Sequence, residues 1–326
     1  MPELPVIEDI TSASQLLDTV ARITPLLESE IVNKQLGGRI LVKAECLQVT
    51  GSFKIRGAWN KVNAIPEKMR NRGVVAYSSG NHAQGVAATA KRLGIPATIV
   101  MPFDAPQIKK ENTRLMGATI VEYDREIESR EAIGAEIANN TGATLVKPYD
   151  DFHIIAGQGT VGLETCIQAG NLNVSIDQLL SPCGGGGLIA GVSLAMHHRF
   201  PRCEVYAVEP LHFEDTTRSL SAGKRLRNTP GYSSLCDSIV TPEPGELTFE
   251  INRKHLAGGI VVDDNSVLRA MRMAFDRFKI VVEPGGAVAL AAVLDGQIPV
   301  AGKTTLVICS GGNVDPLIFA RCLSTG

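Results

Sequence analysis

The sequence predicts an α/β protein in which a larger domain with an open sheet is interrupted by a smaller, parallel α/β domain. Three observations favour this class. Short apolar runs alternate with helix-length segments along the chain, which is typical of parallel strands that are covered on both faces. The length of 326 residues exceeds that of most single domains. One further strand-like run precedes the segment expected to form the smaller domain and four follow it, so the larger domain is expected to be discontinuous.

The smaller domain is assigned to residues 71–148. Its strand-like runs are short and nearly all apolar, and the segments between them are long enough for crossover helices. The runs are "GVVAYSS", "ATIVMP", "ATIVEYD" and "ATLVKPYD". Residues 1–70 and 149–326 are assigned to the larger domain through the runs "RILVKAE", "QLLSP", "EVYAVEP", "GGIVVDD" and "TTLVI". We expect the ligand site in the cleft between the two domains.

Charge and composition exclude several classes of partner. Lys and Arg number 32 and Asp and Glu number 34, and neither sign forms a long run, so nucleic acid is not expected to bind. The apolar stretches are too short to cross a bilayer and no secretory leader opens the chain, so no membrane partner is expected. The seven cysteines stand singly, without zinc-ligand or C-x-x-C spacing. Such a set favours a reducing, cytoplasmic location.

The strongest local signal is a run of four glycines in "SPCGGGGLIAG". The run follows a predicted strand and precedes an apolar, helix-like segment. A loop without Cβ atoms can turn its amides toward one anion, and the start of the next helix adds its positive end. The spacing matches neither a dinucleotide fingerprint nor a P-loop. The predicted ligand of this loop is therefore a phosphate group, bound by Gly184, Gly185, Gly186 and Gly187.

Two more glycine-rich turns, "SSGNHAQG" at 78–85 and "CSGGN" at 309–313, also follow predicted strands. Open α/β sheets bind ligands at the carboxyl ends of their strands, so the three turns are expected to share one polar site. Lys54, in "TGSFKIRG", is either an exposed charge or an amine of that site. A lysine that condenses with a phosphorylated aldehyde would use both the amine and the phosphate loop. Pyridoxal phosphate (PLP) is the cofactor that combines these groups.

Five motifs, in register across nearly the whole chain, resemble the PLP enzymes of the serine/threonine dehydratase family, which have the two-domain fold-type II architecture. These motifs are "SFKIRGA", "SSGNHAQG", "SPCGGGGLIAG", "AVEP" and "CSGGN". The resemblance implies a homodimeric lyase that converts L-threonine or L-serine to a 2-keto acid and ammonia. Two relatives in the same family, 3-hydroxyaspartate dehydratase and serine racemase, are alternatives on the same site.

Two hypotheses come from other classes. A nucleotide-dependent transferase could use the glycine loop for a triphosphate, but no P-loop lysine beside an acidic strand end supports it. A non-catalytic sensor could keep the cofactor as a ligand, but it would be expected to have lost Lys54 or Ser310, and both are present.

The resemblance also implies roles around the cofactor. Lys54 would be the Schiff-base lysine and would remove the Cα proton of the substrate. Phe53 would flank the cofactor ring, and Asn81 would hydrogen-bond its phenolic oxygen. Ser310 would lie at the pyridine nitrogen. A hydroxyl there, in place of a carboxylate, would make the ring a weaker electron sink and favour β-elimination over transamination.

For substrate binding, the resemblance implies a turn that grips the substrate carboxylate with Ser78, Ser79, Asn81 and His82. Ser79 would lie opposite Lys54 and exchange the second proton in a racemase, so racemisation stays open. Helix capping is the alternative role for Asn81 and the serines, and His82 could be a histidine whose hydrogen bonds are satisfied at the start of a helix.

Arg130, in "ESRE" at 128–131, resembles a residue that lies near the substrate in the family. Its guanidinium could bind a second substrate carboxylate through a bidentate pair, which would favour 3-hydroxyaspartate over serine or threonine. The same stretch also fits a helix with charge pairs on a solvated face. The sequence leaves both interpretations open.

The segment "AVEPLHFEDTTRSL" resembles the divalent-cation loop of the family. The implied ligands are the carboxylates of Glu209 and Asp215 and the backbone carbonyl of Phe213, and oxygen ligands of this kind suit Mg²⁺ or Ca²⁺. The chain departs from many relatives at Phe213, where a small residue is common. A solvated acidic loop is the alternative.

Overall fold

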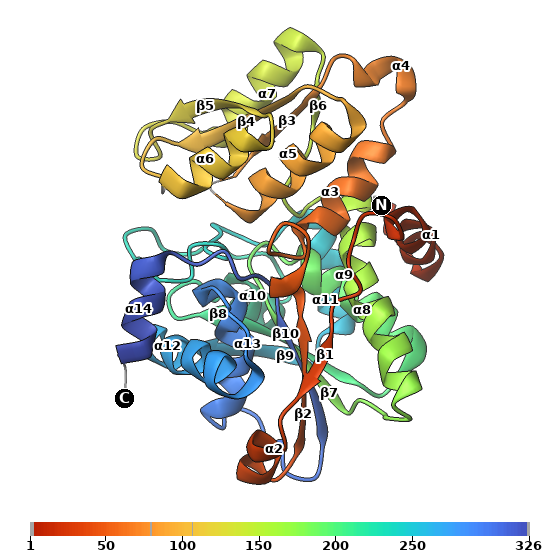
Figure 1. Ribbon diagram of the computed structural model, residues 1–326, viewed down its shortest axis with the longest axis vertical. Coiled ribbons are helices and arrows are strands. Elements are labelled where there is room, and N and C mark those ends of the chain that lie inside the picture. The colour runs from red at the N-terminus through yellow and green to blue at the C-terminus, as the bar shows by residue number, and fades with distance from the viewer. Residues whose placement is uncertain (1–2, 79, 106, 325–326) are drawn as a thin grey trace.

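A computed structural model describes residues 3–78, 80–105 and 107–324. It contains a six-stranded sheet and a four-stranded sheet, which are stacked along the long axis of the molecule (Figure 1). The arrangement confirms the predicted α/β class. The strands of the larger sheet are β1 (Leu26–Glu28), β2 (Arg39–Ala44), β7 (Gln178–Pro182), β8 (Glu204–Pro210), β9 (Gly258–Val262) and β10 (Thr304–Cys309). Those of the smaller sheet are β3 (Val74–Tyr77), β4 (Ala97–Pro102), β5 (Thr119–Tyr123) and β6 (Thr144–Leu145).

The larger sheet is built from both ends of the chain. Its order is β1-β2-β10-β7-β8-β9, so an early strand lies beside the last one. β10 runs parallel to β2, from the pair Thr304 and Arg39 to the pair Cys309 and Ala44. The edge strand β1 is antiparallel to β2, and it was not predicted because its three residues are too few to show a period.

Helices cover both faces of the larger sheet. α12 and α13 pack on one face in a cluster with Val42 and Val307, and α8 and α9 pack on the other in a cluster with Leu41 and Leu179. The helical segments of this part are α1 (Ile7–Leu17), α2 (Glu30–Leu36), η1 (Glu45–Leu47), α8 (Phe152–Asn171), α9 (Gly187–Arg199), α10 (Asp215–Ala222), α11 (Glu246–His255), α12 (Asp264–Met273), the π-helix η2 (Ala274–Phe278), α13 (Pro284–Leu294) and α14 (Pro316–Ser324).

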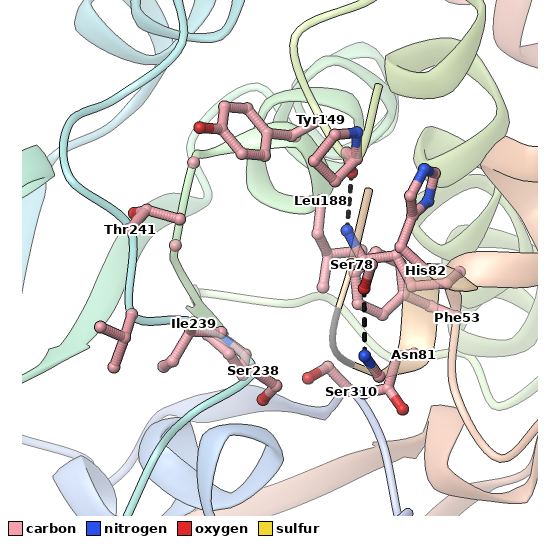
Figure 2. Close-up of a pocket in the computed structure, with 18 of the residues that line it drawn as sticks. Phe53, Ser78, Asn81, His82, Tyr149, Leu188, Ser238, Ile239, Thr241 and Ser310 are labelled. Carbon is pink, nitrogen blue, oxygen red and sulfur yellow. Dashed lines mark hydrogen bonds between the residues drawn. The ribbon is translucent and has the colours of Figure 1, made fainter. Parts of the chain in front are cut away.

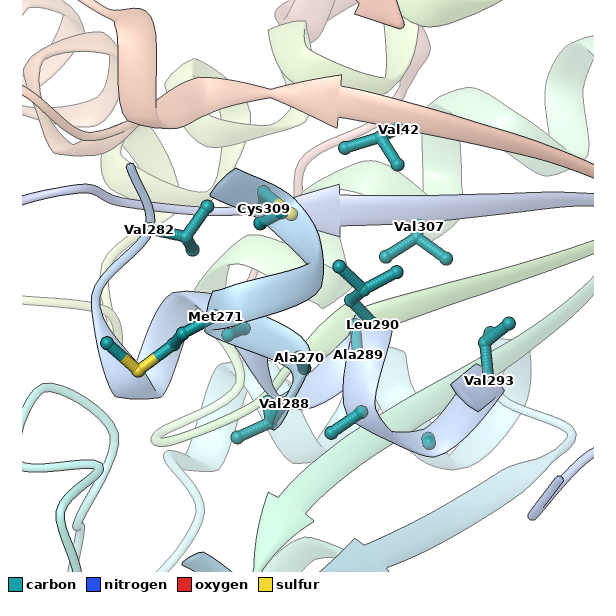
Figure 3. Close-up of a cluster of buried hydrophobic side chains, with 14 of the residues drawn as sticks. Val42, Ala270, Met271, Val282, Val288, Ala289, Leu290, Val293, Val307 and Cys309 are labelled. Carbon is teal, nitrogen blue, oxygen red and sulfur yellow. The ribbon is translucent and has the colours of Figure 1, made fainter. Parts of the chain in front are cut away.

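α13 is apolar on all sides because it is enclosed on all sides. Its residues from Pro284 to Val293 are buried. Figure 3 shows Leu290 on the side of Val307, while Met271 of α12 belongs to the same cluster. None of the helices in the described ranges is both long and apolar enough to cross a membrane.

The smaller sheet has the order β5-β4-β3-β6 and is parallel throughout. Side chains of β3 alternate between its faces: Val74 and Ala76 pack with α5, and Val75 and Tyr77 pack with α7. Its helical neighbours are α3 (Lys54–Asn63), α4 (Glu67–Arg70), α5 (Asn81–Leu93), α6 (Gln107–Leu115) and α7 (Arg130–Thr141). The division of the chain at residues 70 and 148 stays a prediction, and the packing of α3 in this cluster favours an earlier start for the smaller unit.

A buried network of charges joins α3 to the larger sheet. Arg56 donates from Nε and Nη2 to the two carboxylate oxygens of Glu45, at 2.9 and 2.8 Å. Its Nη2 also lies 3.0 Å from Glu164 of α8. Lys43 of β2 donates to the same Glu164 at 2.5 Å. Each of these charges therefore has a partner of opposite sign, which is the condition for burying them.

Candidate active site

The pocket lies where the carboxyl ends of strands from both sheets meet. β3 leads into the turn at Ser78, β7 leads into the four-glycine loop, and β10 leads into Ser310. Figure 2 shows Phe53, Asn81, Tyr149 and Ser310 around this space. The structure thus brings together the three glycine-rich turns and Lys54. The other predicted residues that line it are His82 and Arg130.

The glycine loop has a shape that only glycine can adopt. Gly186 has φ +88° at the start of α9, a left-handed conformation that disfavours other residues. A Cβ at Gly185 would collide with the ring of Tyr149. Within the described ranges, the amides of Gly184, Gly185 and Gly186 donate no hydrogen bond to the protein. They are therefore available to an anion beside the helix start.

Other polar groups along the same wall also lack partners. The side-chain amide of Gln158 and the hydroxyl of Thr241 are buried and, among the described residues, make no hydrogen bond. Both residues line the pocket. Buried polar groups normally have partners, so unpaired donors beside free backbone amides indicate a site for a polar ligand. This set of donors fits a phosphate group.

Lys54 begins α3 and its ammonium group lies inside the pocket. Nζ donates to the carbonyl oxygen of Pro148 at 2.6 Å and lies 5.1 Å from the ring centre of Phe53. Burial lowers the pKa of Lys54 to about 7, against an opposing effect of the negative charge of Glu283. A large fraction of this amine is therefore neutral, and hence nucleophilic, near neutral pH.

Asn81 connects the second glycine-rich turn to the third through Asn313, and it also binds Glu283. Its Nδ2 donates to Glu283 Oε1 at 2.5 Å, and its Oδ1 accepts from Asn313 at 2.7 Å. The side chain does not cap α5, so the alternative of plain capping is not supported for this residue. Burial raises the pKa of Glu283 to about 7. Sequence reasoning missed Glu283, and the only local signal was an acidic residue directly before the proline that opens a helix.

The remaining residues of the predicted carboxylate turn are partly described. Ser78 accepts a hydrogen bond from the amide of Gly80 at 3.1 Å. His82 is buried, and its Nε2 lies 2.8 Å from the carbonyl oxygen of Val146. Burial, and then the charge of Lys54, lower the pKa of His82 to about 3, so it is neutral and donates from Nε2. Ser79, predicted to face Lys54, lies outside the described residues.

Arg130 lies at the first turn of α7 and reaches the pocket. Its guanidinium carbon is 5.5 Å from the ring centre of Tyr77, and its Nε donates to Glu131 at 2.8 Å. Its terminal nitrogens make no hydrogen bond within the described part of the chain. The placement favours a pocket residue over one on a fully solvated face, and two donors stay available to a ligand.

The predicted cation ligands Glu209, Phe213 and Asp215 are buried, whereas Leu211 and His212 between them are exposed. Glu209 accepts from the amides of Thr216 and Thr217, at 2.8 and 2.7 Å, and so caps the start of α10. Asp215 accepts from Asn228 at 2.6 Å, while its second oxygen is buried without a partner among the described residues. Burial raises the pKa of both carboxyls, and the charge of Asp215 raises that of Glu209 further. The alternative of a solvated loop is therefore not supported.

The long segment between α10 and α11 also reaches the pocket. Residues 228–246 are rich in Pro, Gly and Ser, a composition typical of a loop. Asp237, Ser238 and Thr241 of this loop line the site. Figure 2 shows Ser238 and Thr241 across the space from Phe53. Nothing in the sequence singled out these three residues, because a loop has no periodic pattern that indicates which side chains point inward.

Comparisons with known proteins agree with this geometry. A family model described as "Pyridoxal-phosphate dependent enzyme" matches residues 17–311. The chain is 39% identical to L-threo-3-hydroxyaspartate ammonia-lyase of Saccharomyces cerevisiae, over 98% of this chain and 97% of the relative. It is 39% identical to serine racemase of Schizosaccharomyces pombe, over 98% of each chain. A solved threonine deaminase from T.th. superposes with a TM-score of 0.90 at 42% identity, over 95% of this chain and 99% of that one.

These matches cover nearly the whole chain, so they apply to both sheets and to the pocket between them. They argue against the hypothesis of a nucleotide-dependent transferase, because the four-glycine loop belongs to a family that binds the phosphate of PLP. The chain therefore belongs to the family of pyridoxal-phosphate dependent enzymes, and its cofactor is PLP.

Proposed function

We propose that this chain is an ammonia-lyase that eliminates water from a hydroxy amino acid, with L-threonine and L-serine as the default substrates. The observation that carries the proposal is a buried lysine amine, Lys54, with a pKa of about 7, in the same pocket as a row of free glycine amides. The product is a 2-keto acid and ammonia. Relatives named threonine ammonia-lyase, hydroxyaspartate ammonia-lyase and serine racemase support this class of reaction.

The residues present fit PLP. Bound PLP supplies an aldehyde that joins to amines and a ring that accepts negative charge from the substrate Cα. The amides of the four-glycine loop would hold its phosphate, and Phe53 would flank the ring. Asn81 would bind the phenolic oxygen, and Ser310 would lie at the ring nitrogen. Because a serine hydroxyl does not hold that nitrogen protonated, Ser310 favours loss of a β-hydroxyl over longer-lived carbanion chemistry.

Lys54 acts first as nucleophile and then as base. With PLP bound, Lys54 would be the amine joined to it, and once freed its neutral Nζ would take the proton from the substrate Cα. The β-hydroxyl would leave as water with the proton that Nζ took from Cα, and the released enamine would become an imine that water hydrolyses to the 2-keto acid and ammonia. The carbonyl oxygen of Pro148, 2.6 Å from Nζ, orients the amine without adding charge. The turn with Ser78, Asn81 and His82 would hold the substrate carboxylate, and Ser79 would supply the second proton in racemisation.

Hydroxyaspartate is the second candidate substrate, and the observation that favours it is the position of Arg130. Its terminal nitrogens face the pocket without a partner among the described residues. A guanidinium in this state can bind a carboxylate through two parallel hydrogen bonds. The β-carboxylate of 3-hydroxyaspartate is such a group, whereas serine and threonine offer none.

The pair of Glu209 and Asp215 supports a divalent cation, Mg²⁺ or Ca²⁺, with the carbonyl of Phe213 as a further ligand. Both carboxyls are fully buried and one oxygen of Asp215 has no partner among the described residues. Two buried carboxylates side by side repel each other unless a proton or a cation compensates. The part of the chain that the structure describes holds no cluster of three or more acidic, His or Cys ligands, so backbone oxygens and water would complete the site.

We also infer a homodimer in the cytoplasm. Large apolar side chains are exposed on η2 and α14, among them Phe275 at 41% and Leu317 at 81% of their surface. Such a patch is typical of a protein interface. All seven cysteines are buried and none of the described ones forms a disulfide, which fits a reducing compartment.

The rate at which the apoenzyme takes up PLP should rise with pH around a midpoint near 7, because only the neutral amine of Lys54 attacks the aldehyde. Stopped-flow absorbance of the bound cofactor measures this rate. Glu283→Gln should move the midpoint lower, since the charge of Glu283 raises the pKa of Lys54.

Lys54→Ala should abolish turnover and the absorbance of PLP joined to a lysine of the protein. Lys61→Ala on the same helix is the matched control. A midpoint near the ordinary lysine value of about 10.4, or turnover by Lys54→Ala, would refute the assignment.

Arg130→Met should lower kcat/KM for L-threo-3-hydroxyaspartate by about 30-fold or more, because its second carboxylate loses a bidentate partner. Activity on L-serine and L-threonine should change little. Keto-acid release at equal substrate concentrations measures both, and Arg125→Met, a surface arginine paired with Asp104, is the control. An equal loss on all substrates would mean that Arg130 does not read the β-carboxylate, and no loss on any would leave threonine and serine as the substrates.

Removal of divalent cations with a chelator should lower the melting temperature, and readdition of Mg²⁺ or Ca²⁺ should restore it. A cation at a hundred times its Kd adds about 2.7 kcal/mol to the free energy of unfolding. Because burial raises the pKa of Glu209 and of Asp215, these two carboxyls ionise at a lower pH in the unfolded chain than in the folded one. The metal-free protein should therefore lose stability as the pH rises above about 4. Asp215→Asn should remove the cation effect, whereas Glu214→Gln should keep it. Equal melting with chelator and cation would eliminate the site.

Sedimentation velocity should show a dimer at micromolar concentration, and Leu317→Glu should shift it to monomer by placing a charge in the apolar patch. Ile127→Glu is the matched control, since Ile127 is 83% exposed in the smaller unit. A monomeric wild type, or a dimer that Leu317→Glu leaves intact, would contradict this interface.

A further inference from the structure

One ion pair crosses the mouth of the pocket. Nζ of Lys109, on α6, lies 2.9 Å from Oδ2 of Asp237, in the long loop before α11. Figure 1 shows α6 on the side of the smaller sheet that faces the larger part of the molecule. Within the described ranges, no other ion pair joins residues 71–148 to the rest of the chain.

Both partners belong to the wall of the pocket. A Cβ at Gly80 would lie 3.5 Å from Nζ of Lys109, so the ammonium stands beside the turn that precedes Asn81. Asp237 directly precedes Ser238, and both line the space opposite Lys54. The pair thus connects the turn expected to hold the substrate carboxylate with the loop on the far side of the cofactor site.

We propose that Lys109 and Asp237 form a latch that holds the smaller sheet closed over the pocket and so controls the access of small molecules to the cofactor. The latch rests on the proposed function, because it regulates entry to the same site. The amides of the phosphate loop lie on the larger sheet and the carboxylate turn lies on the smaller one. Substrate bound between them would therefore be held more tightly when the two sides are tied together.

The exposure of the pair suits a contact that opens in each turnover. The Lys109 side chain is 11% exposed and that of Asp237 is 50% exposed, so water reaches one partner. Ion pairs with access to water are weak and are screened by salt. The pair of Arg56 and Glu45, by contrast, is closed to water. A weak contact at the mouth can break without disturbing the fixed side of the cleft.

Electrostatics place both partners near the reacting groups. Burial has the largest effect on the pKa of Glu283 and raises it; the positive charge of Lys109 then lowers this pKa, and the negative charge of Asp237 raises it. The effects of the two charges on the pocket oppose each other while the pair is intact. Lys109→Met removes a charge that lowers the pKa of Glu283, so it should move the pH profile of turnover to higher pH. Asp237→Asn removes a charge that raises this pKa, so it should move the profile to lower pH.

The test uses holoenzyme and phenylhydrazine, a small reagent that traps the cofactor aldehyde and changes its absorbance. Asp237→Asn and Lys109→Met should each accelerate trapping about two- to fivefold, in line with the strength of a partly exposed ion pair. The double variant should be no faster than either single variant, because one interaction is lost once. Added NaCl should accelerate trapping in the wild type and leave the double variant unchanged.

A matched control lies one residue away. Lys110, on the same helix, pairs with Glu122 at 2.9 Å inside the smaller unit. Glu122→Gln removes an ion pair of the same type without touching the mouth of the pocket, so its trapping rate should equal that of the wild type. If Glu122→Gln accelerates trapping as much as Asp237→Asn does, the effect is a general loosening of the smaller unit and the latch is refuted.

A rival role for Lys109 is to bind the substrate carboxylate directly. In that case Lys109→Met would raise KM strongly, whereas Asp237→Asn would free the lysine and leave KM unchanged or lower it. A latch predicts that both single variants raise KM, by a similar factor on every amino acid tested. The trapping assay contains no amino acid, so its result stands even if the proposed substrates are wrong. Unchanged trapping in both single variants would overturn the latch.

Discussion

The position of Lys54 depends on the buried charges around Arg56, two residues farther along α3. Arg56 donates to Glu45 from Nε and Nη2, one edge of its guanidinium, and also reaches Glu164, which in turn binds Lys43. Breaking such a buried pair typically costs about 3–5 kcal/mol, since a charge is left without a partner. α3 also packs in the hydrophobic cluster of the smaller sheet. One helix therefore carries the reactive lysine, belongs to the smaller cluster and is fixed to the larger sheet.

This arrangement gives the cleft one rigid side and one adjustable side. On the rigid side, the charges of Arg56 and Glu45 are almost fully closed to water. On the adjustable side, Lys109 and Asp237 meet where water reaches the aspartate. The physical difference is solvation: a pair closed to water is expensive to break, whereas a pair at the mouth exchanges its partner for water at low cost. The pocket can thus open while Lys54 keeps its place.

Enclosure also sets the chemistry of the pocket. Burial lowers the pKa of Lys54 and raises that of Glu283, and both values come to about 7. An ordinary lysine and an ordinary glutamate would differ by about six units, so enclosure in the pocket brings the two pKa values together near neutral pH. The glycine loop contributes neutral amides toward the phosphate site, and therefore adds no cation that would lower the pKa of Lys54 further.

The sequence by itself determined the α/β class and the glycine loop, because each depends on a contiguous stretch with its own backbone preference or period, and its resemblance to a family predicted the role of Lys54. Tertiary structure alone decided that Glu283, Lys109 and Asp237 enter the pocket. Asn81 and Glu283 are 202 residues apart, and Lys109 and Asp237 are 128 apart. Arg130 fitted both a solvated helix and a pocket, and only the packing of α7 beside Tyr77 distinguished them. Contacts between distant segments depend on how the sheets meet, and no local pattern of residues records that geometry.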